Sequence, residues 1–133
     1  MNAVFADTSF YLALLDECDP SHLRARTESQ IQREIVTTEF IVLELGNSCA
    51  QADDHADFLA LVAGIRASPR TTVVPLDSGL LQRGLDLLAE RPDKDWSLTD
   101  CVSFVVMEEH GLREALTKDH HFEQAGFTIH LKE

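Results

Sequence analysis

Four acidic residues stand beside apolar residues or where a helix begins, and their types suit one kind of chemistry: Asp7, Glu44, Asp100 and Asp119. Carboxylate oxygens are the protein ligands that hard dications such as Mg²⁺ prefer. Carboxylates that a fold brings close together repel one another, and a shared cation removes that repulsion. If the fold gathers these side chains, the sequence predicts a divalent-metal site.

Short segments rich in β-forming residues alternate with longer segments of helical period, which indicates an α/β fold with a parallel sheet covered by helices. The predicted strands are residues 3–6, 34–37, 71–74, 114–117 and 127–131. Helices are predicted directly after Asp7, from Asp19-Pro20 onwards, over residues 38–51, 54–67, 77–90 and 97–111, and briefly after Asp119.

The order of these elements places all four acids at one edge of the sheet. In a parallel sheet, the helix that follows a strand starts at the carboxyl end of that strand, where such folds bind ligands. Asp7 and Asp119 directly follow the first and fourth predicted strands. Asp100 lies in the first turn of a predicted helix, and Glu44 lies within the first two turns of another. We therefore expect their carboxylates to converge.

Helix capping is an alternative explanation for three of these acids. Asp7 and Asp119 stand where an N-cap is expected, and Ser97 and Asp100 have the spacing of a capping box. Glu44 has no such explanation, because it interrupts an apolar run and shares a helix face with Phe40. A buried carboxylate requires a partner, and no Lys or Arg occurs from residue 35 to residue 55.

Composition restricts the class of protein. A chain of 133 residues fits one domain, and its formal net charge of −12 disfavours non-specific binding to nucleic acid. No apolar stretch resembles a signal peptide or a membrane span, so we expect a cytoplasmic protein. Cys18, Cys49 and Cys101 are odd in number and far apart, so we expect reduced, buried thiols.

Four segments carry a resemblance to a known family. They read FADTSF, FIVLELGN, LTDC and LTKDHHF, and occupy residues 5–10, 40–47, 98–101 and 116–122. In this order and spacing they resemble the acidic motifs of PIN-domain ribonucleases, most closely the VapC-type toxins of toxin–antitoxin pairs. The resemblance implies a single PIN domain over residues 1–133, a three-layer fold of about seven helices around a sheet of strand order 3-2-1-4-5, and cleavage of RNA.

The resemblance also implies roles for particular residues. Asp7 and Asp100 are expected to bind one or two Mg²⁺ or Mn²⁺ ions directly. Glu44 is expected to be a further ligand or to orient the attacking water, and Asp119 to complete the site. Ser9 is expected to hydrogen-bond a phosphate oxygen or to fix a ligand, with capping of the first helix as the alternative.

The partners implied by the resemblance are RNA, a small antitoxin and a second copy of the chain in a homodimer, with no membrane contact. A different class of function is also open, in which a PIN-like fold without catalytic activity binds a basic protein through its acidic surface. We expect His120 and His121 to lie in a solvated turn and Trp96 to pack at the start of a helix. Three arginines are expected on a solvated face of the second helix: Arg24, Arg26 and Arg33.

Overall fold

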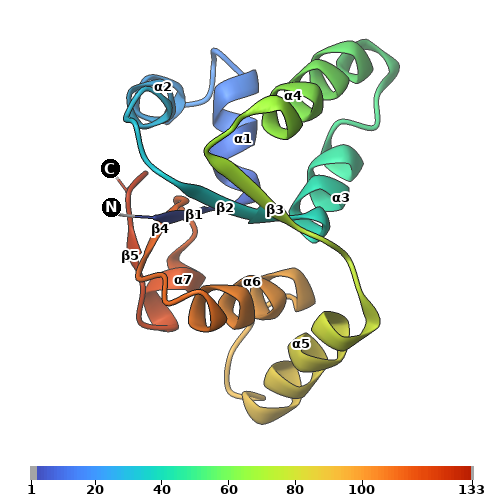
Figure 1. Cartoon of the computed structure of the whole chain (residues 1–133), viewed down its shortest axis with the longest axis vertical. Coiled ribbons are helices and arrows are strands. Elements are labelled where there is room, and N and C mark those ends of the chain that lie inside the picture. Colours follow the sequence, from blue (N-terminus) through green and yellow to red (C-terminus); the bar gives the residue numbers. More distant parts are fainter. Residues whose placement is uncertain (1–2, 133) are drawn as a thin grey trace.

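The structure, a computed structural model, describes residues 3–132. At its centre is a five-stranded parallel sheet with the order β3-β2-β1-β4-β5, which confirms the expected topology (Figure 1). Val36 in the middle of the sheet pairs with Phe5 on one side and with Thr72 on the other. The strands are β1 (Val4–Ala6), β2 (Ile35–Thr38), β3 (Thr71–Val74), β4 (Glu114–Leu116) and β5 (Thr128–Ile129).

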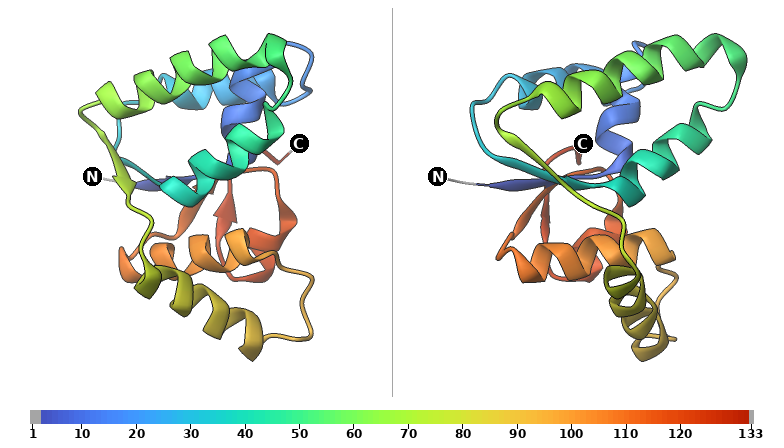
Figure 2. Two further views of the ribbon diagram at one scale, coloured as in Figure 1. Left: turned by 90° about the vertical axis from the view of Figure 1, so that its right-hand side faces the viewer. Right: turned by 45° about the vertical axis from the view of Figure 1, so that its right-hand side comes forward.

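In the described part of the chain, seven α-helices cover the two faces of this sheet, as predicted. Four lie on one side and three on the other, so the chain forms three layers (Figures 1 and 2). Among residues 3–132, no helix combines the length and apolar character that crossing a membrane requires. The first side carries α1 (Thr8–Leu15), α2 (His22–Ser29), α3 (Glu39–Ser48) and α4 (His55–Ala67), and the second carries α5 (Ser78–Glu90), α6 (Leu98–Glu109) and α7 (His120–Gln124).

Several element boundaries differ from the prediction by one to three residues, among them those of β5 and α2. β5 comprises two residues rather than five. α2 begins at His22 and not at Asp19, because the Asp19 carboxylate accepts a hydrogen bond from the backbone N–H of Ser21 (2.8 Å) and so closes a turn. Aspartate side chains form such local turns readily, and here the turn competes with the helix that Asp19-Pro20 predicts.

Glycine ends the two helices that lead into β4 and β5. At Gly111 (φ 67°) the N–H of Leu112 bonds the carbonyl of Met107 (2.8 Å), and at Gly126 (φ 99°) the N–H of Phe127 bonds the carbonyl of Phe122 (3.0 Å). Both are six-residue C-terminal motifs that need a left-handed residue, which glycine adopts without steric cost. These turns redirect the chain from α6 and α7 back into the sheet.

The core beneath the sheet is aromatic. Phe104 of α6 makes edge contacts with the rings of Trp96 and Phe122, at 4.9 Å between centroids in both cases. Trp96 is buried, as predicted, and its indole N–H donates to Gln124 (3.1 Å). This packing ties the start of α6 to α7, and therefore fixes the positions of the two acids that these helices carry.

Candidate active site

All four predicted acids lie at the carboxyl edge of the sheet. Asp7 follows β1, and Asp119 lies just beyond β4, the neighbouring parallel strand. Asp100 is in the first turn of α6 and Glu44 is in α3, two helices that contact each other across this edge. The charges of Asp100 and Glu44 both act on Asp7, and the charge of Asp119 acts on Asp100. The structure therefore places the four carboxylates at one edge of the sheet, close enough for their charges to interact, and we call these four residues the acidic cluster.

Asp7 is the most deeply buried acid of this cluster, with 6% of its surface exposed. It stands at the N-cap position of α1, but its side chain makes no capping hydrogen bond, so the capping alternative is wrong here. Burial raises the pKa of Asp7 to about 6; hydrogen bonds from the Thr117 hydroxyl and the backbone of Thr8 act in the opposite direction. The charges of Asp100 and Glu44 are smaller contributions to the same rise in the pKa.

Asp100 has both roles that the sequence suggested for it, since it caps a helix and also belongs to the cluster. Its backbone N–H donates to the Ser97 hydroxyl (3.0 Å), and its Oδ2 accepts from the backbone N–H of Ser97 (3.1 Å), which completes a capping box. Burial raises the pKa of Asp100, and so does the charge of Asp119, while the bond from Ser97 and the contact with His121 lower it.

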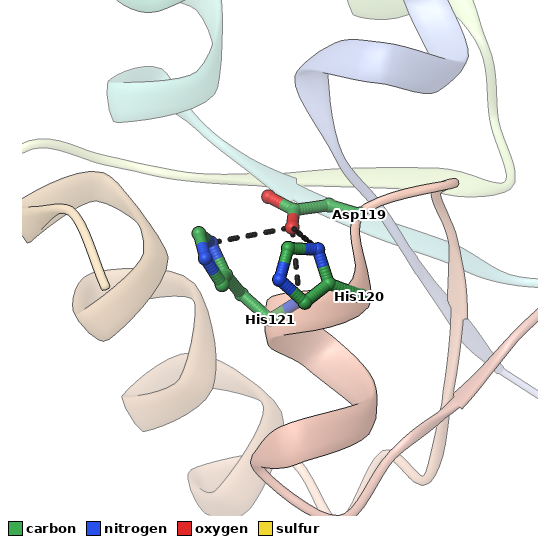
Figure 3. A group of neighbouring side chains, drawn as sticks. All are labelled: Asp119, His120 and His121. Atoms are coloured by element: carbon green, nitrogen blue, oxygen red, sulfur yellow. Dashed lines mark hydrogen bonds and ion pairs between the residues drawn. The ribbon is translucent and has the colours of Figure 1, made fainter. Parts of the chain in front are cut away.

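Asp119 caps α7, and its carboxylate accepts from the backbone N–H of His121 (2.9 Å). The expectation of a solvated turn is wrong for His121. Its Nδ1 lies 3.2 Å from Asp119 Oδ1 and 3.1 Å from Asp100 Oδ2, and its side chain is 22% exposed. The expectation holds for His120, whose side chain is 69% exposed. Figure 3 shows both imidazoles beside the Asp119 carboxylate. The first turn of α7 directs one imidazole of the pair into the acidic cluster.

Glu44 is half-buried rather than enclosed in the core. Its helix neighbour Ile41 is fully buried, whereas the Glu44 carboxylate reaches the edge of the sheet and accepts a hydrogen bond from the Thr8 hydroxyl (2.5 Å). Within residues 3–132, the ion pairs made by the four acids are with His120 and His121. The partner that Glu44 requires is thus a hydroxyl group.

Two hydroxyl groups, those of Thr117 and Ser9, organise the surroundings of Asp7. Thr117 donates to Asp7 Oδ2 (2.8 Å), and Ser9 Oγ lies 2.9 Å from the Thr117 hydroxyl and 3.3 Å from Asp7 Oδ2. Ser9 lies inside α1, so its alternative role as the cap of that helix is wrong. Sequence reasoning missed Thr117 and Thr8, although both stand within two residues of a predicted acid.

The residues present fit a hard divalent cation. They supply carboxylate oxygens from four separate elements, and a dication placed among them would offset the burial and the repulsion that together raise the pKa of Asp7. Asp7, Asp100, Asp119 and Glu44 could hold such an ion. The hydroxyl groups of Thr8 and Thr117 donate hydrogen bonds to Glu44 and Asp7 and so orient these carboxylates, as the supporting partners of metal ligands commonly do.

Two further expectations need correction. Arg33 is not solvated, because its guanidinium donates to the buried carboxylate of Glu28 (2.8 Å) and only 10% of its side chain is exposed. Cys18 is an exposed thiol, whereas Cys49 and Cys101 are buried as expected, and all three are free.

Comparison with known proteins agrees with this architecture. The model of the PIN domain family matches residues 4–128. The 23S rRNA-specific endonuclease VapC20 of Mycobacterium tuberculosis is 29% identical over 126 residues, which cover 93% of this chain and 95% of that protein. A crystal structure of VapC20, described as a toxin that cleaves the sarcin–ricin loop, superposes with a TM-score of 0.83 at 27% identity, covering 94% of this chain and 96% of the other.

More distant structures share the fold. The DNA-bound VapBC complex of Salmonella typhimurium has a TM-score of 0.67 at 20% identity, with 97% of each chain covered. FitAcB of Neisseria gonorrhoeae has a TM-score of 0.66 at 18% identity, with 95% of each chain covered. The family match spans nearly the whole sheet and all seven helices, and the acidic edge lies within it. This chain therefore belongs to the PIN domain family.

Proposed function

We propose that this protein is an endoribonuclease that requires Mg²⁺ or Mn²⁺ and acts as the toxin of a toxin–antitoxin pair. The observation that carries the proposal is the state of Asp7, a buried carboxylate with a pKa near 6 on which the charges of Asp100 and Glu44 also act. A cation beside such a group would favour its ionised form, because it offsets the burial and the neighbouring negative charges. The name of the mycobacterial relative supports RNA, and specifically 23S rRNA, as the first substrate to test.

In this proposal Asp7 and Asp100 bind the ion directly, and Asp119 completes a site for one or two ions. When bound, the ion supplies positive charge that stabilises the phosphate in the transition state. Glu44, held by the Thr8 hydroxyl, orients the water that attacks phosphorus and accepts its proton, while the bond from phosphorus to the leaving oxygen breaks. Ser9 serves to position Asp7 through the hydroxyl network.

A small antitoxin is the partner that we propose, in line with the toxin–antitoxin complexes among the proteins of similar fold. An apolar surface suits such a partner, since Leu43 and Leu76 are exposed beside a cavity of about 210 Å³ between α3, α4 and β3. The net charge of −12 favours a basic antitoxin. A single PIN domain, a cytoplasmic location and a homodimer remain parts of this proposal.

The test is cleavage of 23S rRNA, and of a short RNA with the sarcin–ricin loop sequence, in Mg²⁺ or Mn²⁺. Asp7→Asn and Asp100→Asn should abolish cleavage and relieve growth inhibition, while the exposed control Asp53→Asn should not. Unchanged cleavage in both site variants would contradict the proposal. Absence of both cleavage and metal-dependent stabilisation in the unmodified protein would favour the binding module instead.

A further inference from the structure

A histidine nitrogen lies between two carboxylates of the acidic cluster. His121 Nδ1 is 3.1 Å from Asp100 Oδ2 and 3.2 Å from Asp119 Oδ1. Asp119, His120 and His121 also form a group whose potential ligand atoms all lie within 4.8 Å of one another (Figure 3). The roles proposed for the four acids assign no function to this nitrogen atom.

Hydrogen bonds at the starts of α7 and α6 fix this arrangement. Asp119 Oδ1 also accepts the backbone N–H of His121, which ties the carboxylate and the imidazole to the same turn of α7. The capping box with Ser97 holds Asp100 at the start of α6. The aromatic contact between Phe104 and Phe122 packs α6 against α7, so the three ligand atoms are positioned by the core. Preorganised ligands of this kind favour metal binding.

The two separations measured from His121 Nδ1 match adjacent corners of a metal coordination shell, although Asp100 is not in the group whose ligand atoms all lie within 4.8 Å of one another. In an octahedron with metal–ligand distances of about 2.1 Å, neighbouring ligand atoms are separated by about 3 Å. Both separations at His121 are close to that value. A carboxylate oxygen has two lone pairs, so Asp100 Oδ2 can keep its bond from Ser97 while it binds an ion.

We propose that His121 supplies a nitrogen ligand, through Nδ1, to an ion shared with Asp100 and Asp119, and that it biases the site towards Mn²⁺ over Mg²⁺. This inference rests on the proposed metal-dependent function and deepens it. Mg²⁺ is held almost entirely by oxygen, whereas first-row transition ions accept imidazole nitrogen readily. His120 is not the ligand, because it is largely exposed and its Nδ1 is 3.8 Å from Asp119 alone.

The decisive variant is His121→Asn, which places an amide oxygen near the position of Nδ1 and so replaces nitrogen by oxygen. The matched control is His120→Asn, the same chemical change one residue earlier in α7. Both variants should retain the wild-type circular dichroism spectrum. Binding of Mn²⁺ alone is followed by the loss of its free electron paramagnetic resonance signal, and Mg²⁺ affinity is measured by competition.

In wild-type protein, pulsed electron paramagnetic resonance of bound Mn²⁺ should show coupling to a directly coordinated ¹⁴N. His121→Asn should lose this coupling and about tenfold in Mn²⁺ affinity, with Mg²⁺ affinity changed by less than about threefold. His120→Asn should keep the coupling and both affinities. Coupling that persists in His121→Asn, or an unchanged preference between the two ions, would overturn the assignment.

The failure of this inference is distinguishable from failure of the proposed function. If wild-type protein binds Mn²⁺ saturably and Asp100→Asn abolishes binding, but no ¹⁴N coupling is seen, the acidic metal site stands and the role of His121 is refuted. If wild-type protein binds neither ion, both the metal-dependent function and the nitrogen ligand are refuted together.

Discussion

Two buried carboxylates in this molecule have opposite surroundings. Glu28 of α2 is 5% exposed and Asp7 at the sheet edge is 6% exposed, so both have lost nearly all contact with water. Glu28 is compensated by cations, with Arg33 at 2.8 Å and Arg24 at 3.4 Å. Asp7 receives hydrogen bonds from hydroxyl groups, and the charges that act on it belong to other acids.

The difference separates a structural acid from a functional one. A buried charge requires compensation, and the fold provides it for Glu28 from its own arginines. At Asp7 the fold adds further negative charge instead, which destabilises the ionised protein until an external cation arrives. Proteins accept such local instability at functional sites because binding or catalysis depends on it.

The largest expected effect concerns catalysis. Asp7→Asn should lower kcat/KM for RNA cleavage by about 1000-fold or more, since it removes a metal ligand. Glu28→Gln, an equally buried acid-to-amide change, should leave kcat/KM within about threefold at a temperature where the variant is folded. Cleavage of a labelled RNA under single-turnover conditions measures both. Equal losses in the two variants would mean that the two acids do not differ in function.

The second effect concerns stability, and here Glu28→Gln is the damaging substitution. Glu28→Gln should lower the free energy of unfolding by about 3 kcal/mol, because it leaves the nearly buried Arg33 guanidinium without its carboxylate. Urea denaturation at neutral pH measures the loss. A variant as stable as wild type would show that the pair contributes no net stability.

The third effect is a gain in stability from the substitution that abolishes activity. The folded pKa of Asp7, about 6, lies above its ordinary value of 3.8, so ionisation of Asp7 opposes folding. The favourable contribution of the protonated form is complete below pH 3.8 and is lost as the pH rises through 6. In metal-free buffer, Asp7→Asn should therefore gain up to roughly 3 kcal/mol over wild type between pH 4 and pH 7.5.

Urea denaturation of wild type and Asp7→Asn at several pH values in the presence of a chelator tests this pH dependence. A stability difference that stays constant across the range would show that the pKa of Asp7 is the same in the folded and the unfolded protein, and that its burial carries no electrostatic cost.

The position of the four acids at the carboxyl edge of the sheet could be predicted from sequence, because it follows from short local patterns. Asp7 and Asp119 follow β-rich runs directly, and a parallel sheet necessarily places such residues at one edge. Capping signals marked Ser97 and Asp100 correctly. The strand order came from the family resemblance, since no local pattern specifies which parallel strands are neighbours.

The burial of Glu28 and the position of His121 could not be predicted from sequence, because both depend on contacts between distant segments. The sequence around Glu28 is polar and reads as an exposed helix, yet α2 packs so that Arg33 and His130 converge on its carboxylate. His120 and His121 are alike in sequence. Only the rotation of α7 on the aromatic core decides that His121 faces Asp100 while His120 faces solvent.

The smallest effect is the response of stability to metal. Mg²⁺ at ten times its dissociation constant should stabilise wild-type protein by about 1.4 kcal/mol, because the ion binds only the folded state. Glu28→Gln should show the same increment from its lower starting point, since its change lies outside the metal site. Asp7→Asn should show little or none, although it is the most stable protein without metal. Thermal denaturation with and without Mg²⁺ measures all three, and an equal increment in Asp7→Asn would place the bound ion away from the acidic edge.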